Sequence, residues 1–568
     1  MKQRIIIYSL CLLVFSANAQ TNFTKADTLR GSLNENRDWF DVQHYTLQIN
    51  PNLIEHSIDN SSVIWECKVV KPSKKIQIDL QQPMIIDEIY FNLLSDKTGS
   101  NLEVRKKIQF TREGNIALAD IDTSLQAGNL FRISIKYHGK PKEAIRPPWD
   151  GGWIWKTDAN GKPWVSVACQ GLGSSVWYPC KDHQSDEPDK GVTMFLKTFD
   201  GLASLSNGRE VIKEEGAHSE GHWNVTNPIN TYNVVPYIGD YIEWHEKYKG
   251  LKGNLDINYW VLRSDSAKAR KQFTQVPQML KAFEYWFGPY PFYEDGFKMI
   301  QSPHLGMEHQ SAIAYGNKFG NGYLGRDLSG TGLGLKWDFI IVHESGHEWF
   351  ANNITSKDRA DMWIHESFTN YSETLFTEYY YGKSAAEAYI KGLRKRIRND
   401  RPIIGDYGVN QEGSSDMYDK GGNMIHTIRQ IIDDDKKFRK ILVGLNKQFY
   451  HQTVNTQQIE DYFSKHSGIN CSFIFNQYLR TKDIPILNYY FEGNKLKFKW
   501  ENCISNFKMP IKISVNGRKE QWILPEQSHY KSIAIRKKKI NQLKINDNFY
   551  VKELKLNNRM PIQESHQK

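Results

Sequence analysis

The sequence predicts a multidomain α+β protein with an all-β N-terminal part, a mostly helical middle and a small all-β C-terminal domain. Between about residues 41 and 241, short alternating stretches such as 45–49 and 131–135 are separated by Asn, Gly, Pro and Lys turns. This pattern is typical of a β-sandwich or saddle. Apolar residues then recur at helical spacing from about residue 267. Alternation returns after Pro485, where Asn516-Gly517 marks a hairpin turn.

The length and composition agree with several folded domains. At roughly 100–200 residues per domain, 568 residues predict two to four domains. The chain is 39% hydrophobic and 13% aromatic, which excludes wholesale disorder, collagen and coiled coil. We divide it into residues 1–19, a signal peptide; 20–243, an N-terminal β domain; 244–485, a catalytic domain; and 486–568, a basic β-sandwich domain.

The first 19 residues have the pattern of a secretory signal peptide. Lys2 and Arg4 precede an apolar run over residues 5–15, and residues 17–19 form an A-x-A cleavage site. The apolar run is shorter than the about 20 residues that span a membrane, and no later segment approaches that length. We therefore expect export to the periplasm or the extracellular space, and a mature chain without a transmembrane segment.

The formal net charge of +10 is concentrated in one domain. Residues 486–568 carry 17 Lys and Arg against 7 Asp and Glu. The remainder is close to neutral, and no nucleic-acid motif accompanies the charge, so we expect no nucleic-acid partner. The basic run over residues 536–539 is interpreted as a solvated turn or strand end, with a patch for an anionic surface as the alternative.

Two local features remain open from the sequence. Five cysteines follow the leader, too few for a disulfide scaffold, and Cys169 and Cys180 could be either bridged or free. Residues 141–173 are rich in Pro, Gly and Trp, and we expect a packed irregular loop there, with a Trp-lined sugar site as the alternative.

The strongest chemical motif is the H-E-x-x-H string that begins at His343. On a helix, His343 and His347 share one face and can bind one Zn²⁺, while Glu344 can reach a water molecule on the ion. A catalytic zinc takes a third protein ligand, and a third His is excluded because Phe350 and Asn353 stand where that class has Gly and His. Glu366, on the next predicted helix, completes a set of two His and one Glu.

With these residues the chain resembles the aminopeptidase N family of zinc exopeptidases, gluzincins related to thermolysin. Residues 305–309, Leu-Gly-Met-Glu-His, are similar to the family's G-x-M-E-N motif, and residues 418–421, Tyr-Asp-Lys-Gly, to its Y-x-K-G element. Smaller similarities occur at residues 41–45, 170–180 and 287–292. Leu305 and His309 depart from the motif, as do Ser345 and Gly346 in the helix, but no ligand or base is missing.

The resemblance implies a thermolysin-like catalytic domain with one Zn²⁺ per chain and a role for each motif residue. Glu344 would act as general base towards a zinc-bound water, and Tyr418 would stabilise the oxyanion. Glu308 would hold the substrate's free α-amine, helped by Gln170 and flanked by Gly306 and Met307. Glu373, two helical turns after Glu366, is expected to orient a ligating His. His309 and His365 are expected to neighbour the site without binding the metal.

The function predicted from these residues is an exported zinc aminopeptidase that acts on peptides with a free N-terminus. Two alternatives remain: a zinc endopeptidase, in which Glu308 would have no amine to bind, and a non-catalytic peptide-binding relative. The second is disfavoured because His343, Glu344, His347, Glu366 and Tyr418 are all present.

Overall fold

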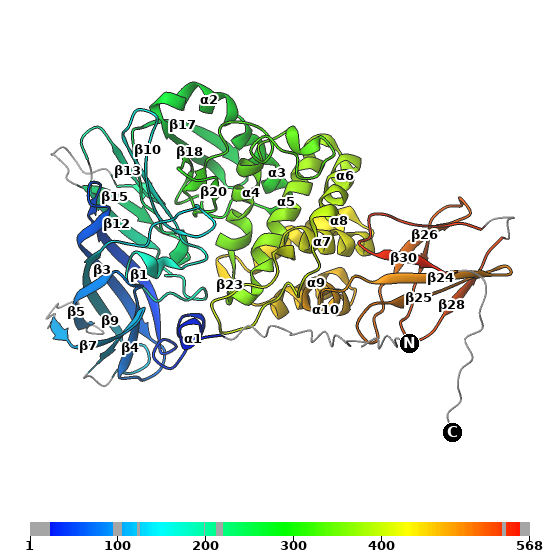
Figure 1. Ribbon diagram of the computed structural model, residues 1–568, viewed down its shortest axis with the longest axis horizontal. Helices are drawn as coiled ribbons and strands as arrows, with labels where there is room; N and C mark the ends of the chain where they lie inside the picture. The colour runs from blue at the N-terminus through cyan, green and yellow to red at the C-terminus, as the bar shows by residue number, and fades with distance from the viewer. Residues whose placement is uncertain are drawn as a thin grey trace, which may run out of the picture.

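The predicted fold class is confirmed by the computed structural model, which describes residues 23–94, 105–121, 125–197, 199–211, 220–536 and 541–556. Figure 1 shows β sheets of the N-terminal region, a helical middle and a C-terminal β region in chain order along the long axis. The predicted signal peptide, residues 1–19, and the lysines of the 536–539 run lie outside the described residues. No described helix has both the length and the apolar character needed to cross a membrane.

The N-terminal region is built around one large sheet. Its alternating strands bury one face, and the long neighbours β1 (Phe40–Ile49), β3 (Ser57–Val69) and β9 (Leu130–Gly139) pair antiparallel at its centre. The outer strands are β2 (Pro51–Asn52), β5 (Ile85–Leu94), β6 (Lys106–Ile108), β12 (Val192–Lys197), β14 (Arg209–Glu210) and β15 (Glu220–Val225). A small sheet adds β4 (Lys75–Asp79), β7 (Phe110–Glu113) and β8 (Ile116–Asp120).

The expectation of an irregular loop over residues 141–173 is wrong for about half of that segment. β10 (Gly152–Thr157) and β11 (Pro163–Ala168) form a regular antiparallel hairpin, and β11 continues through β16 (Tyr237–Gly239) to β13 (Ala203–Leu205). The tryptophans explain the error, because Trp153 is fully buried and stacks on Trp155 at 4.7 Å. Trp153 and Trp155 are therefore strand residues, whereas Trp149 lies in the loop before β10 and is 70% exposed.

The middle region combines a sheet with a bundle of helices. The sheet runs in the order β17 (Tyr241–Gly250), β18 (Gly253–Leu262), β19 (Phe297–Gln301), β21 (Ile313–Tyr315) and β20 (Gly306–Met307). The helices are α2 (Ser266–Gln272), α3 (Gln275–Phe287), α4 (Phe339–Gly346), α5 (Trp363–Tyr381), α6 (Lys383–Leu393), α7 (Asp419–Ile432), α8 (Asp435–Gln448), α9 (Thr456–Ser467) and α10 (Ser472–Arg480). The short strands β22 (Ile354–Ser356) and β23 (Gln452–Val454) pair parallel. Another helix, α1 (Lys25–Gly31), lies near the N-terminal sheets.

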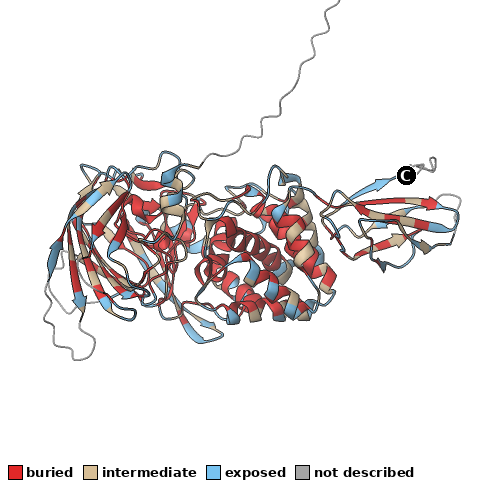
Figure 2. Ribbon diagram, turned by 90° about the horizontal axis from the view of Figure 1, so that it is seen from below, coloured by how far each residue is buried: buried red, intermediate tan, exposed pale blue. Residues whose placement is uncertain are grey.

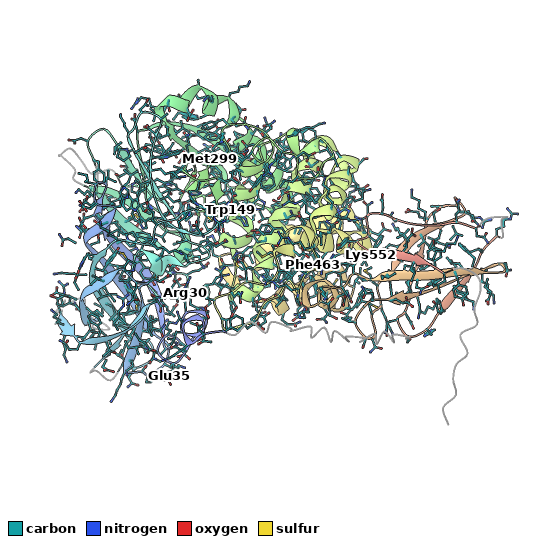
Figure 3. All side chains as sticks on the ribbon, viewed as in Figure 1. Arg30, Glu35, Trp149, Met299, Phe463 and Lys552 are labelled. Atoms are coloured by element: carbon teal, nitrogen blue, oxygen red, sulfur yellow. The ribbon has the colours of Figure 1, made fainter. Side chains whose placement is uncertain are left out.

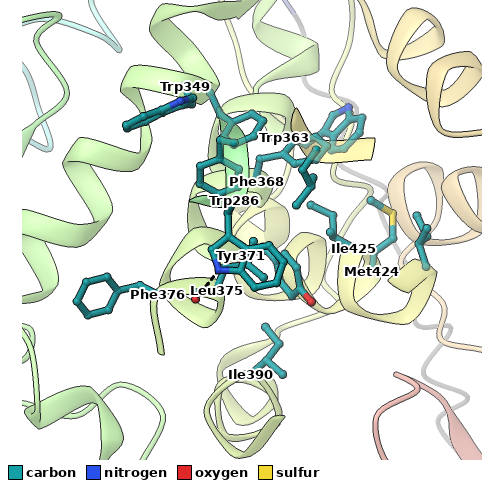
Figure 4. Close-up of a cluster of buried hydrophobic side chains, with 14 of the residues drawn as sticks. Trp286, Trp349, Trp363, Phe368, Tyr371, Leu375, Phe376, Ile390, Met424 and Ile425 are labelled. Atoms are coloured by element: carbon teal, nitrogen blue, oxygen red, sulfur yellow. Dashed lines mark hydrogen bonds between the residues drawn. The ribbon is translucent and has the colours of Figure 1, made fainter. Parts of the chain in front are cut away.

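Helix α5 is the centre of the helical core. Residues from Trp363 to Thr377 are all buried, so the helix is covered on every side, as Figure 2 shows for the interior of the bundle. Figure 4 shows aromatic side chains of α3, α5 and the segment after α4 packed together, with the Trp286 indole donating a 3.0 Å hydrogen bond to the Leu375 carbonyl. A helix buried all round has a fixed rotation, which fixes the direction of every side chain on it.

Glycines bring the neighbouring helices close to α5. A Cβ at Gly346 of α4 would lie 2.6 Å from the Ser372 Oγ, and one at Gly421 of α7 would lie 1.8 Å from the Ser367 Oγ. Glycine at position 346 costs the helix about 1 kcal/mol of stability relative to Ala. It avoids the contact that an added Cβ would make with the Ser372 side chain. Both contacts hold the backbone of a functional helix against α5.

The C-terminal region is a pair of facing sheets docked on α6 and α7. One sheet contains β24 (Ile486–Glu492), β25 (Lys495–Glu501), β28 (Lys531–Ala534) and β30 (Lys552–Lys555), and the other β26 (Ile511–Val515), β27 (Gln521–Ile523) and β29 (Leu543–Ile545). Arg394 donates to the backbone carbonyls of Asp547 and Asn548 at the junction. All cysteines among the described residues are free thiols, which answers the open question on Cys169 and Cys180.

Replacement of Gly421 with Ala is expected to destabilise the protein by about 1–3 kcal/mol, because the new methyl group overlaps Ser367 and forces α7 away from α5. Thermal unfolding followed by circular dichroism measures the change. Gly320→Ala is the control, since its added Cβ meets no atom within 4 Å. Equal stability of the two variants would contradict the packing argument.

Candidate metal centre and active site

Helix α4 presents His343 and His347 to the same cavity. Asp338 caps the helix by accepting hydrogen bonds from the amides of Ile340 and Ile341, and the side chains of Gln272 and Tyr315 also bind its carboxylate. The helix has only 8 residues. It ends at Gly346, and the backbone turns sharply at Phe350 and Ala351. His347 keeps helical dihedral angles, so the two imidazoles still lie one turn apart.

The carboxylate of Glu366, near the start of α5, meets both histidines. Its Oε2 lies 3.8 Å from His343 Nε2 and 3.5 Å from His347 Nε2, and all three residues are buried. The three ligand atoms lie within 4.8 Å of one another. Two separate helices therefore converge on a site about as wide as one metal ion and its ligands.

The hydrogen bonds of the two histidines leave both Nε2 atoms facing the Glu366 carboxylate. His343 Nδ1 bonds the Glu373 carboxylate at 2.8 Å, and His347 Nδ1 bonds the Phe350 carbonyl at 3.0 Å. Both acceptors require a hydrogen on Nδ1, so each Nε2 turns a lone pair towards Glu366. Glu366 Oε2 is itself buried without a hydrogen-bond partner. Two imidazoles and a carboxylate of this kind fit a divalent cation such as zinc.

Glu344 lies beside the triad, where it can exchange a proton with a ligand of the cation. Burial, and then the negative charges of Glu308 and Glu373, raise the pKa of its carboxyl well above the ordinary value. A cation bound by the neighbouring ligands would lower the pKa of this carboxyl. Gly306 of β20 approaches this carboxylate closely, since a Cβ there would lie 2.6 Å from Glu344 Oε1.

Glu308 occupies the adjoining wall of the cavity and is held in place by several donors. Gln170 Nε2 donates to its Oε1 at 2.5 Å and the Tyr232 hydroxyl to the same oxygen at 2.9 Å. The Asn352 amide donates to its backbone carbonyl at 2.8 Å. Tyr232 and Asn352 were not found from the sequence, because neither belongs to a motif. A ligand atom of Glu308 also lies within 4.8 Å of ligand atoms of Glu344 and His347.

Tyr418 precedes the first residue of α7 and lines the cavity opposite α4. Its ring lies 6.1 Å from the His343 ring. Burial and then the charges of Glu366 and Glu412 raise the pKa of the phenol well above its ordinary value, so it remains a hydrogen-bond donor at neutral pH. Glu412 pairs with Arg359 at 2.9 Å, and Arg359 donates to the Gln170 carbonyl.

The remaining predicted residues lie around this site. Glu373 bonds His343 with Oε1 and accepts the Tyr389 hydroxyl at 2.6 Å with Oε2. His309 Nδ1 bonds the Tyr237 hydroxyl, and His365 Nε2 accepts the Ser356 amide, so each imidazole has a nitrogen in a structural bond. Met307 lines the cavity beside Gly306.

The candidate metal ligands, Glu344, Glu308, Gln170, Glu373 and Tyr418 line one cavity of about 560 Å³ between the N-terminal region and the helical middle. That volume is typical of a pocket that encloses a small ligand. Trp149, which is 70% exposed, stands at its rim near Gln170, and Figure 3 shows Trp149 where the two regions meet. A metal centre, a buried base and a fixed carboxylate in one cavity are suited to hydrolysis of a polar bond.

The chain is similar to known proteins over much of its length. Residues 272–478 match the "Peptidase family M1 domain". The chain is 21% identical over 81% of its length to "Probable aminopeptidase 2" of Sulfurisphaera tokodaii, covering 58% of that protein. It is 23% identical over 79% of its length to "Aminopeptidase N" of Lactobacillus helveticus, covering 52% of that protein. The chain thus spans only about half to three fifths of these relatives.

A solved structure agrees with the fold. The M1 zinc metallopeptidase of Deinococcus radiodurans superimposes with a TM-score of 0.64 at 19% identity, over 79% of this chain and 95% of that one. A mutant form of that enzyme has been solved with a Tyr-ser-ala substrate, with a TM-score of 0.64 at 18% identity over 79% of this chain and 96% of that one.

Replacement of Glu373 with Gln is expected to weaken zinc binding by about 10- to 100-fold, because the His343 imidazole loses the carboxylate that orients it. Competition with a chromophoric chelator measures the dissociation constant. Glu387→Gln on α6 is the matched control and should leave zinc affinity unchanged. Equal affinity of the Glu373 variant and wild type would contradict the orienting role.

Proposed function

Because the chain belongs to the aminopeptidase N family of zinc metallopeptidases, peptidase family M1, we propose that it is an exported zinc-dependent aminopeptidase that removes N-terminal residues from peptides. The observation that carries the proposal is the position of Glu308. Its buried carboxylate is fixed by Gln170 and Tyr232 next to the candidate metal ligands. A fixed anion at that place favours a substrate ammonium group.

The substrate is positioned from its N-terminus. The α-ammonium group pairs with Glu308, and the amide donor of Gln170 prevents that carboxylate from turning away. Because the distance from Glu308 to the metal ligands is fixed, only the first peptide bond reaches them. An internal peptide bond has no ammonium group next to it, so the same carboxylate would remain buried without a partner.

The chain's own residues carry the proton transfers. A single zinc ion held by His343, His347 and Glu366 would polarise the scissile carbonyl and activate a water molecule. Glu344 accepts a proton from the attacking water and donates it to the leaving amine. Tyr418, protonated because of its raised pKa, donates a hydrogen bond to the carbonyl oxygen on which negative charge develops.

Two other functions are compatible with parts of the site. An endopeptidase would use the same metal ligands and base but not Glu308. A peptide-binding protein without activity would keep the cavity and have no use for Glu344. The proposal is preferred because Glu308 and Glu344 face one cavity together with the metal ligands.

Export is proposed from the sequence pattern of residues 1–19. Cleavage after Ala19 would give a mature N-terminus at Gln20. Mass spectrometry of the protein recovered from the periplasm or the medium is expected to show that N-terminus. An intracellular protein that keeps residues 1–19 would contradict it.

The aminopeptidase proposal predicts different effects for two acidic residues. The wild type should cleave a peptide and not its N-acetylated form, and a chelator should abolish activity that zinc restores. Glu344→Gln should lower kcat by about 10²- to 10⁴-fold, because the proton acceptor is lost. Glu308→Gln should instead raise KM for the free peptide and reduce the discrimination against the N-acetylated one.

Steady-state kinetics with both peptides measures these effects, and metal content is determined for every variant. Equal cleavage of the free and N-acetylated peptides by the wild type would favour the endopeptidase. Full activity of Glu344→Gln would refute the mechanism, and peptide binding without turnover in the zinc-loaded wild type would favour the binding protein.

A further inference from the structure

The cavity has two chemically different ends. One end contains Glu308 with Gln170 and Tyr232, as described above. The other contains Tyr323, Arg326 and Arg396, which line the same cavity. Nothing in the proposed mechanism uses these three residues.

The second end lies beyond His343 as seen from Glu308. The Glu308 carboxylate clusters with Glu344 and His347. His343, one helical turn before His347, stacks its ring on Phe339 at 5.0 Å, and Phe339 packs edge-on against Tyr323 at 5.3 Å. A substrate whose ammonium group is bound by Glu308 therefore extends its leaving part, after the metal ligands, towards Tyr323.

Arg326 contacts the Tyr323 ring, and Arg396 lines the same cavity. Arg326 lies over the ring at 5.3 Å from its centre. Burial raises the pKa of the Tyr323 phenol, Arg326 and Arg396 lower it, and the negative charge of Glu344 raises it. The residues come from two separate segments, the loop before α4 and the turn after α6.

The charge at this end is only partly neutralised. Arg396 pairs with Asp419 at 2.8 Å, whereas no carboxylate in the described part of the chain lies within ion-pair distance of Arg326. At the Glu308 end, by contrast, Arg359 is paired with Glu412. Arg326 is exposed at the cavity and lies over a tyrosine ring, so its guanidinium offers donors that suit a carboxylate.

We propose that Tyr323, Arg326 and Arg396 bind a substrate carboxylate on the leaving side of the scissile bond, so that the preferred substrates are short peptides with a free C-terminus. The inference rests on the proposed aminopeptidase function and names its substrate class. An acidic side chain on a leaving residue offers the same chemistry as a C-terminal carboxylate, and the experiment separates the two. The cavity volume of about 560 Å³ agrees with a short peptide.

The test compares di-, tri- and tetrapeptides of one N-terminal residue, each as the free acid and as the C-terminal amide. A second set carries Asp or Glu in a leaving position with an amidated C-terminus. The wild type is expected to show a kcat/KM about 10-fold or more higher for the free acid than for the amide at one of the three lengths. Arg326→Gln should remove that difference by lowering kcat/KM for the acid alone.

Two controls separate this inference from the proposed function and from folding defects. Arg105 lies 3.9 Å from the Tyr90 ring centre in the N-terminal sheet region, so Arg105→Gln makes the same change to a guanidinium over a tyrosine ring outside the cavity. It should leave the acid-to-amide ratio unchanged. An aminoacyl p-nitroanilide, which has no leaving-side carboxylate, should be hydrolysed equally by Arg326→Gln and the wild type.

Each result has a definite meaning. Equal kcat/KM values for the free acids and the amides at all three lengths would overturn the carboxylate site. An equal loss of kcat/KM for acids and amides in Arg326→Gln would do the same. Neither result would contradict the proposed aminopeptidase activity. A preference only for acidic side chains would overturn the short-peptide substrate class. Failure to hydrolyse any peptide or anilide with zinc bound would refute the aminopeptidase and this inference together.

Discussion

The close approach of α4 to α5 is the constraint on which the site depends. Gly346 lets α4 lie against the Ser372 side chain of α5, where a Cβ would come within 2.6 Å of the Ser372 Oγ, and the complete burial of α5 fixes its rotation. Glu366 therefore points at the histidines of α4 and cannot turn to solvent. The Glu366 Oε2 is buried without a hydrogen-bond partner beside two imidazoles, which is unfavourable in isolation, so the folded helices create a site that a divalent cation would stabilise.

The rest of the catalytic cavity is assembled by contacts with that pair of helices. Gly421 brings the start of α7, and with it Tyr418, against α5. Gly306 lets β20 lie close to the Glu344 carboxylate. Glu308 follows two residues later and accepts hydrogen bonds from Gln170 and Tyr232 of the N-terminal region. The candidate site thus lies between two regions, and the N-terminal region supplies the donors that hold Glu308. The opposite end is built by the loop before α4 and the turn after α6, which explains why its charge differs from that of the Glu308 end.

Much of the site was predictable because its chemistry is encoded in local spacing. An H-E-x-x-H string on one helical face identifies His343, Glu344 and His347, and the resemblance to a known family assigned Glu308 and Tyr418. Tyr232 was missed because a lone tyrosine in a β-rich region carries no signal, although its hydroxyl bonds Glu308. The hairpin of β10 and β11 was missed because tryptophans that fill a core look the same in sequence as tryptophans in a loop.

The sequence by itself determined the order of β, helical and β regions, the candidate metal-ligand set and the location of the excess charge, because periodicity, motif spacing and composition are local properties. The tertiary structure decided which donors hold Glu308, where the helix after His347 breaks, and which arginines share the cavity. These depend on contacts between residues far apart in the chain, such as Gln170 with Glu308 and Arg396 with Asp419. Distances of that kind are set by packing, which no pattern within one segment records.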